Sequence, residues 1–166
     1  MAATALNARL DFLVRVTQKE CAYLQDTDHR LFGDLFTIEE ARKIATDPIL
    51  AERLDAFVSR FGRLQDTVGD KLLPAVLVAL AEKPGSAIDN MDRAEKLGLL
   101  ESVDTWMEMR KLRNQMVHEY IEDLAVLFSA LYSGHAYVPT LLATAGRFVA
   151  EVKRIQQRQH GAKPAG

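Results

Sequence analysis

The sequence contains a single cysteine, Cys21, and no long uninterrupted apolar run. One cysteine cannot form a disulfide within the chain, and it fits a protein of a reducing compartment. No run approaches the roughly 18 apolar residues needed to cross a bilayer, and the first residues lack the positive charge that opens a secretion signal. We therefore expect a cytoplasmic protein with no membrane segment, in which Cys21 is a small residue within a helix or, alternatively, a reactive thiol.

A large excess of charge of either sign is also missing. The net charge is -2 at pH 7, and the isoelectric point is about 6.1, so the protein as a whole does not attract polyanions. Any contact with nucleic acid must be made by a local patch. The sequence also lacks a glycine-rich phosphate loop, a Cys/His metal-binding spacing and a Gly-x-Ser-x-Gly elbow. We predict neither a metal nor a cofactor.

The abundant apolar residues, 48% of the chain, follow a helical spacing. No segment alternates with a period of two for long enough to be a strand, so we predict an all-α fold. The length fits one domain, which we assign to residues 1–160, with a flexible tail at 161–166. The expected helices cover residues 6–24, 37–46, 48–72, 74–81, a short polar stretch at 89–98, a segment from 102, and residues 124–131 and 139–155.

Helix starts are marked by residues that cap free backbone N–H groups. Thr37 with Glu40 matches a capping box, Asp47-Pro48 combines an N-cap with proline at the first helical position, and Ser102 can cap the next helix. Trp106 then follows as an expected core anchor.

Helix ends are predicted from clusters of turn formers. Residues 26–33 read as a connection or a frayed helix end with a surface His29, and residues 83–86 as a clear break. A further break is predicted at residues 132–135, with Pro139 opening the last helix, and the polar residues from 156 onward are expected to fray. Pro74 either kinks its helix or starts a new one.

The helix predicted over 48–72 contains two glycines, Gly62 and Gly69. Each weakens a helix by about 1 kcal/mol relative to alanine, so their presence indicates close helix packing. Charged residues, among them Arg60 and Arg63, occupy another face. These charges are either a solvated surface or part of a phosphate-binding surface.

The stretch from Arg110 to Tyr120 brings together an arginine, an amide, an imidazole and a phenol within a few residues. A neutral imidazole near pH 7 can take a proton from a ribose 2′-hydroxyl or give one to a leaving oxygen. Arginine can hold a phosphate and offset developing charge. The candidate residues are Arg113, Asn114, His118 and Tyr120, with Arg110 and Lys111 beside them.

Helix geometry alone does not aim Arg113 and His118 at one atom. At about 100° per residue, side chains five residues apart point about 140° away from each other. Either a helix break near His118, with Glu119 and nearby acids opening a new helix, or a two-fold interface would bring such residues together. Otherwise His118 only hydrogen-bonds a neighbour at a helix end and Tyr120 packs at the rim.

The segment Arg113-Asn114-Gln-Met-Val-His118-Glu-Tyr120 resembles the Arg-x4-6-His motif of the HEPN superfamily, including the polar residue that follows the arginine. Its His-x-Tyr ending is similar to HepT-type toxins, which pair with an MNT-type minimal nucleotidyltransferase antitoxin. It also resembles proteins described as nucleotidyltransferase substrate-binding subunits. The resemblance implies an antiparallel helical bundle with a four-helix core and additional helices, which forms a homodimer.

The resemblance further implies a metal-independent endoribonuclease with its cleft at the dimer interface. Arg113 would bind phosphate and stabilise transition-state charge, Asn114 would orient the substrate, and His118 would perform acid-base catalysis. The antitoxin would silence the enzyme by transferring AMP to Tyr120. Candidates for binding RNA are Arg110, Lys111, Arg60 and Arg63.

Two alternatives remain open from the sequence. The protein could be a non-catalytic HEPN adaptor that binds a nucleotidyltransferase or presents substrate to it. It could also be a structural helical dimer in which Arg113 and His118 matter only for packing.

Overall fold

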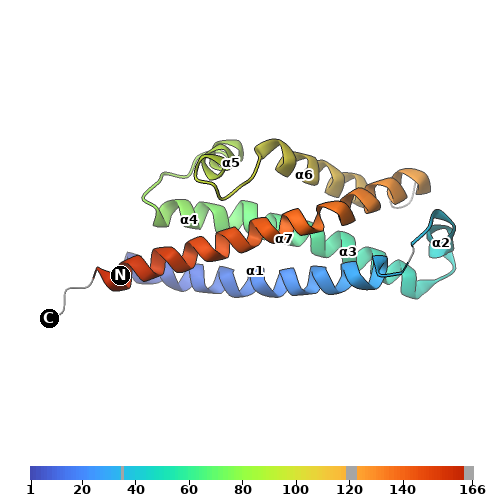
Figure 1. Cartoon of the computed structure of the whole chain (residues 1–166), viewed down its shortest axis with the longest axis horizontal. Coiled ribbons are helices and arrows are strands. Elements are labelled where there is room, and N and C mark those ends of the chain that lie inside the picture. Colours follow the sequence, from blue (N-terminus) through green and yellow to red (C-terminus); the bar gives the residue numbers. More distant parts are fainter. Residues whose placement is uncertain (35, 119–122, 163–166) are drawn as a thin grey trace.

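The structure is a computed structural model of the chain, and it describes residues 1–34, 36–118 and 123–162. The described residues form helices and no strands, which confirms the predicted all-α class. Four long helical rods dominate the molecule (Figure 1). They are α1 (Ala2–Phe32), α3 (Pro48–Asp66) with its continuation, α6 (Val103–His118) and α7 (Leu124–Gly161).

The four rods alternate in direction, and the start of α1 and the end of α7 lie at the same end of the molecule (Figure 1). Helix α1 packs on α3 and α7, and α6 packs on the same two helices. Each rod therefore has two neighbours, as in an antiparallel four-helix bundle. This arrangement confirms the predicted bundle.

The second rod is longer than a single α-helix. Helix α3 passes into a π-helical segment, η2 (Thr67–Leu72), which passes into α4 (Leu73–Ala79). Leu73 donates its backbone N–H to the carbonyl of Val68, five residues earlier. Pro74 falls in the first turn of α4, where a missing N–H costs no hydrogen bond within that helix. Of the two alternatives for Pro74, the structure shows the start of a new helix.

The predicted caps are present. Thr37 and Glu40 form both hydrogen bonds of a capping box at the start of α2 (Ile38–Ala41), which continues as the 3₁₀ turn η1 (Arg42–Ala45). Asp47 accepts hydrogen bonds from two N–H groups in the first turn of α3. Ser102 accepts one from Thr105 at 3.2 Å.

The polar segment after residue 86 is also helical as expected. Helix α5 (Ala87–Lys96) starts at the N-cap Ser86. It ends just before Gly98, whose φ of +74° is the left-handed conformation that glycine adopts without strain. The predicted break at residues 83–86 separates α5 from α4.

Of the two interpretations of residues 26–33, a connection or a frayed helix end, the connection is wrong, because α1 runs on to Phe32 and ends there. Leu31 is buried in the core, and the ring of Phe32 packs edge-on against Phe57 at 5.3 Å between centroids. Asp26 and Arg30 form an ion pair one turn apart. Apolar burial at the end of α1 outweighs the turn-forming residues before it. His29 is exposed, as predicted.

The predicted break at residues 132–135 is also wrong, because α7 is continuous from Leu124 to Gly161 with Pro139 inside it. Gly134 is buried, and a β-carbon there would lie only 3.3 Å from the sulfur of Met116 on α6. This glycine allows close helix packing and does not end the helix. The last turns of α7 cover residues 156–161, where fraying was expected.

The core lies along the axis of the bundle. Trp106 is 2% exposed, which confirms its expected role as an anchor, and Phe57, Phe61 and Phe148 are buried beside the leucines of α1 and α3. Helix α7 includes an 18-residue window of mean hydropathy 1.2, enough by length and composition alone to cross a membrane. A third of that window is buried in this bundle, and a core helix passes the same test.

Candidate functional site

The second rod and α6 approach closely because two glycines, one in α3 and one in η2, face two large side chains of α6. A β-carbon at Gly62 would lie 2.6 Å from the Nε atom of Arg113, and one at Gly69 would lie 3.1 Å from the ring of Trp106. The two glycines are seven residues apart, and so are the two α6 residues, in the opposite chain direction. The close packing inferred from these glycines is present, and it lays the Arg113 side chain across the surface of α3.

Two ion pairs hold α6 to the second rod beside these contacts. The Nη1 atom of Arg113 donates to Oδ1 of Asp66 at 2.6 Å, and Arg110 pairs with Asp70 of η2 at 3.6 Å. The buried side chain of Gln65 adds a hydrogen bond to the carbonyl of Trp106 at 3.1 Å. The arginines of the polar segment thus meet carboxylates of the second rod.

Arg113 lines a groove of about 600 Å³ between α3 and α6. Its apolar lining includes Met116, which is buried, and Val117, which is 52% exposed. This volume falls in the range of small-ligand sites. The residues lining it are Asp55, Val58, Ser59, Gly62, Arg63, Asp66, Arg113, Met116 and Val117.

His118 does not line this groove. It is the last residue of α6 and is exposed, and Asn114 is likewise exposed and outside the lining. Because α6 is helical from Val103 to His118, Arg113 and His118 lie five residues apart on one helix, a spacing that turns side chains about 140° from each other. Tyr120 and Glu119, together with the possible acidic helix start that includes them, lie outside the described residues. Asp123 is the N-cap of α7.

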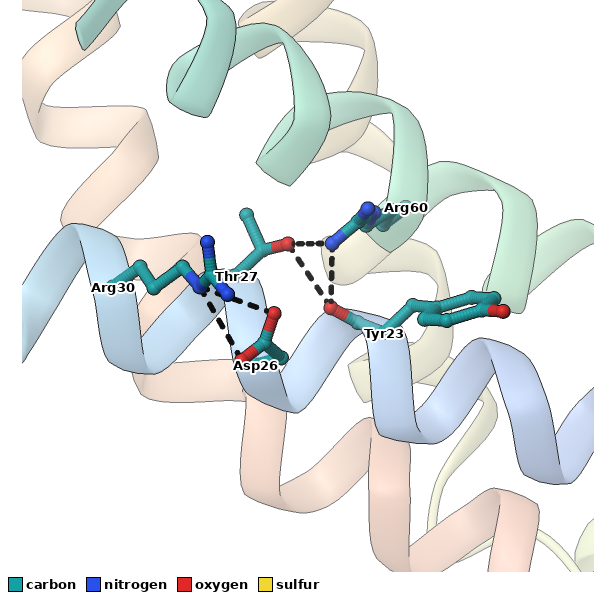
Figure 2. Close-up of polar contacts among 5 residues, drawn as sticks. All are labelled: Tyr23, Asp26, Thr27, Arg30 and Arg60. Carbon is teal, nitrogen blue, oxygen red and sulfur yellow. Dashed lines mark hydrogen bonds and ion pairs between the residues drawn. The ribbon is translucent and has the colours of Figure 1, made fainter. Parts of the chain in front are cut away.

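Arg60 is used within the fold. Its Nη1 atom donates to the carbonyl of Tyr23 at 3.1 Å and to the hydroxyl of Thr27, and its guanidinium lies 5.3 Å from the centre of the Tyr23 ring (Figure 2). Thr27 in turn donates to the same Tyr23 carbonyl. These contacts tie α3 to α1, and they place Arg60 outside the groove that Arg113 enters.

Arg63 and Lys111 are both exposed, on different grooves. Arg63 lines the α3–α6 groove, and its Nη2 atom donates to the hydroxyl of Ser59 at 3.1 Å. Lys111 faces a second groove between α6 and α7, beside Tyr137. There the hydroxyl of Tyr137 donates to Glu108 at 2.5 Å, which raises the pKa of the phenol. Of the predicted RNA-binding residues outside the motif, Arg63 alone lines the groove with Arg113.

The inner face of α1 carries two groups with raised pKa values. Burial raises the pKa of Glu20, which accepts a hydrogen bond from Thr67, and one of its oxygens has no partner within the described chain. Burial, with the nearby Glu20 charge, raises the pKa of Cys21 to about 11. A thiol with that pKa stays protonated at neutral pH, which favours the small-residue interpretation of Cys21.

The ligand set of a metal site is not found in the described part of the chain, where His, Cys, Asp and Glu side chains do not gather in groups of three or more. The chemistry available in the α3–α6 groove is that of guanidinium, carboxylate and hydroxyl groups, with an imidazole outside it.

Sequence reasoning missed the partners of Arg113. Asp66 and Gly62 lie 47 and 51 residues before it, and Asp55 and Ser59 were not singled out. One signal was available. Asp55, Ser59, Gly62 and Asp66 follow each other at steps of four, three and four, so they share one face of α3.

Comparisons with protein-family models, curated proteins and solved structures give no match to this chain.

Proposed function

We propose that the protein is a HepT-like toxin, a metal-independent endoribonuclease that acts as a homodimer and is neutralised by an MNT-type nucleotidyltransferase. One observation carries the proposal. Arg113 is held across Gly62, with its side chain 29% exposed, in a groove that leads toward the end of α6 where His118 is exposed. An anchored arginine and an accessible imidazole are the groups that phosphodiester cleavage without metal needs.

The reaction needs no group beyond these side chains and the RNA itself. A neutral His118 takes the proton of a ribose 2′-hydroxyl, and the 2′-oxygen attacks the adjacent phosphorus. The bond from phosphorus to the 5′-oxygen breaks, and that oxygen receives a proton from an imidazolium. The products are a 2′,3′-cyclic phosphate and a 5′-hydroxyl end. Arg113 has five N–H donors, of which Asp66 takes one, so others can bind the phosphate oxygens.

The proposal requires two copies of the chain. Arg113 and His118 of one chain point apart, so we place the His118 of one copy near the Arg113 of the other across a two-fold axis. Asn114, exposed on the same helix, would orient the RNA. The antitoxin would act by transferring AMP to Tyr120, two residues beyond His118.

A second candidate function is the non-catalytic adaptor of a nucleotidyltransferase. The pairing of Arg113 with Asp66 and of Arg110 with Asp70 favours it, because an anion must compete with a carboxylate for each arginine. In this alternative both arginines serve mainly to hold α6 on the second rod. A stable complex with a nucleotidyltransferase and no nuclease activity would be its signature.

The deciding experiment is RNA cleavage in EDTA by the unmodified protein, His118→Ala and His160→Ala. His160 is an exposed histidine in the last turn of α7, so its variant controls for the loss of a surface imidazole. We expect cyclic-phosphate ends from wild type and His160→Ala, and no cleavage by His118→Ala. Full activity of His118→Ala would refute the proposal. No cleavage by wild-type protein of verified unmodified mass would favour the adaptor, and a pull-down with a nucleotidyltransferase would follow.

A further inference from the structure

The α3–α6 groove extends well beyond the arginine that enters it. Asp66 lies toward one end and Asp55 toward the other, separated along α3 by roughly 16 Å at 1.5 Å per residue. Arg113 crosses the middle, at Gly62. The groove is therefore long enough to hold more than the phosphate that Arg113 could bind.

The two carboxylates of the groove differ in their ion-pair partners. Asp66 accepts the hydrogen bond from Arg113, whereas Asp55 is exposed and enters no ion pair within residues 1–34, 36–118 and 123–162. Asp55 lies one turn before Ser59, on the face of α3 that lines the groove. An exposed carboxylate in a groove is a hydrogen-bond acceptor for a ligand.

The sides of the groove suit a flat ring. Val58 and Val117 give it apolar surface, and Val117 remains 52% exposed. Arg63 is exposed at the same groove, and a guanidinium plane can stack on a base. Single-stranded RNA is commonly recognised in this way, with stacking on the base faces and hydrogen bonds to the base edges.

We propose that this groove is a nucleobase subsite selective for guanine, in which Asp55 accepts hydrogen bonds from the base edge. This inference rests on the proposed function only in taking Arg113 as the phosphate-binding group. Arg113 crosses α3 at Gly62, about 10 Å or two turns along the helix from Asp55. That spacing lets one nucleotide place its phosphate at the arginine and its base edge at the carboxylate.

The chemistry of the carboxylate selects the base. The Watson–Crick edge of guanine presents two parallel donors, N1–H and the 2-amino group, which match the two oxygens of one carboxylate. Adenine and cytosine present an amino group beside an unprotonated ring nitrogen, so one oxygen of Asp55 would face another acceptor. Uracil presents a single N–H between two carbonyl oxygens. A well-formed bidentate contact discriminates between bases by roughly tenfold or more.

The first test is calorimetric binding of the four nucleoside 5′-monophosphates to the full chain. We expect GMP to bind roughly tenfold more tightly than AMP, CMP or UMP. Asp55→Asn should remove that preference, because an amide offers one acceptor and one donor to the edge. Asp92→Asn, the same change at an exposed position on α5, should keep it. Both aspartates are exposed, so neither variant should fail to fold.

The second test maps cleavage positions in a random RNA pool with the same variants. The subsite would be supported if wild type and Asp92→Asn prefer guanine next to the cleaved bond and Asp55→Asn does not. Cleavage with no base preference, or with one unchanged in Asp55→Asn, would overturn the subsite and leave the ribonuclease proposal intact. A GMP preference that depends on Asp55 without any RNA cleavage would support the subsite and count against the ribonuclease. If the protein shows neither GMP binding nor RNA cleavage, both proposals are overturned.

Discussion

Replacing Gly62 with alanine tests whether the Arg113 side chain must lie across α3. The new β-carbon would sit 2.6 Å from Nε of Arg113 and 3.2 Å from its Cδ atom. No real contact is that short, so the arginine must move. The nearest atoms all belong to a flexible side chain, so we expect the fold to survive and the position of the guanidinium to change.

The stability change can be estimated from two opposing effects. Alanine within a helix is favoured over glycine by about 1 kcal/mol. The ion pair of Arg113 with Asp66, whose side chains are 29% and 36% exposed, is partly screened and worth about 0.2–1 kcal/mol. The effects nearly cancel, so the melting temperature of Gly62→Ala should stay within about 3 °C of wild type.

The matched control is Gly146→Ala in α7, where a β-carbon meets nothing within 4 Å. It should show the full helix-propensity gain, a rise in melting temperature of about 2–4 °C. Circular dichroism melts measure this difference. In the EDTA cleavage assay Gly62→Ala should lose roughly 10- to 100-fold in rate, since about 1 Å of misplacement can cost that much, and Gly146→Ala should lose nothing.

A double-mutant cycle makes the test independent of enzymatic activity. With Arg113→Ala in place, the clash is gone, so Gly62→Ala should stabilise the protein as much as Gly146→Ala does. If Gly62→Ala already gives that full gain in the wild-type background, then Arg113 does not depend on the space above Gly62 and the description of the site is wrong.

Three further predictions concern other side chains. Because the pKa of Cys21 is raised to about 11, its thiol should react slowly with thiol reagents at pH 7.5. The free energy of unfolding should fall as the pH rises from about 9, where the unfolded thiol ionises. Cys21→Ala should abolish this dependence in urea titrations. Glu20→Gln should raise the melting temperature at pH 7, because the raised pKa of Glu20 shows that its charge is disfavoured in the fold, and the gain should vanish near pH 4 and below. Arg60→Ala should lower stability by about 1–2 kcal/mol through its lost bonds to α1, whereas Arg63→Ala should change it by less than about 0.5 kcal/mol; equal losses would refute the assignment of Arg60 to the fold.

The fold class and most helix starts could be predicted because their determinants are local. Thr37 with Glu40, Asp47 and Ser102 cap helices through bonds that span two or three residues. Such contacts depend little on the rest of the chain, and apolar periodicity needs only neighbouring positions.

The errors arose where tertiary burial overrides local preference. Residues 132–135 read as a break because serine and glycine favour turns, but Gly134 is packed against Met116 and Phe57, which lie far from it in sequence. The same applies to the end of α1, where Leu31 and Phe32 are anchored by the core. A glycine required for close packing looks the same in sequence as one required for a turn.

The candidate site could be predicted only in part for the same reason. The motif supplied Arg113 and His118, and the glycines indicated close packing. The ion pair of Arg113 with Asp66 depends on how α6 lies against α3, which the sequence does not show. Asp55 gave no signal of its own, because an exposed carboxylate on a helix is ordinary until a groove is seen beside it.

The pairing of Arg113 with Asp66 bears on both proposed functions, and its size decides how strongly. A partly exposed ion pair is worth about 1 kcal/mol at most, so displacing Asp66 would weaken phosphate binding by about fivefold or less. A guanidinium that binds phosphate through two parallel hydrogen bonds can offset such a cost. The pairing of these arginines with carboxylates therefore favours the adaptor only by this small amount. The stronger constraint is the position of His118, which does not line the groove in a single chain. The oligomeric state of the active protein therefore separates the two functions more sharply than its charges do.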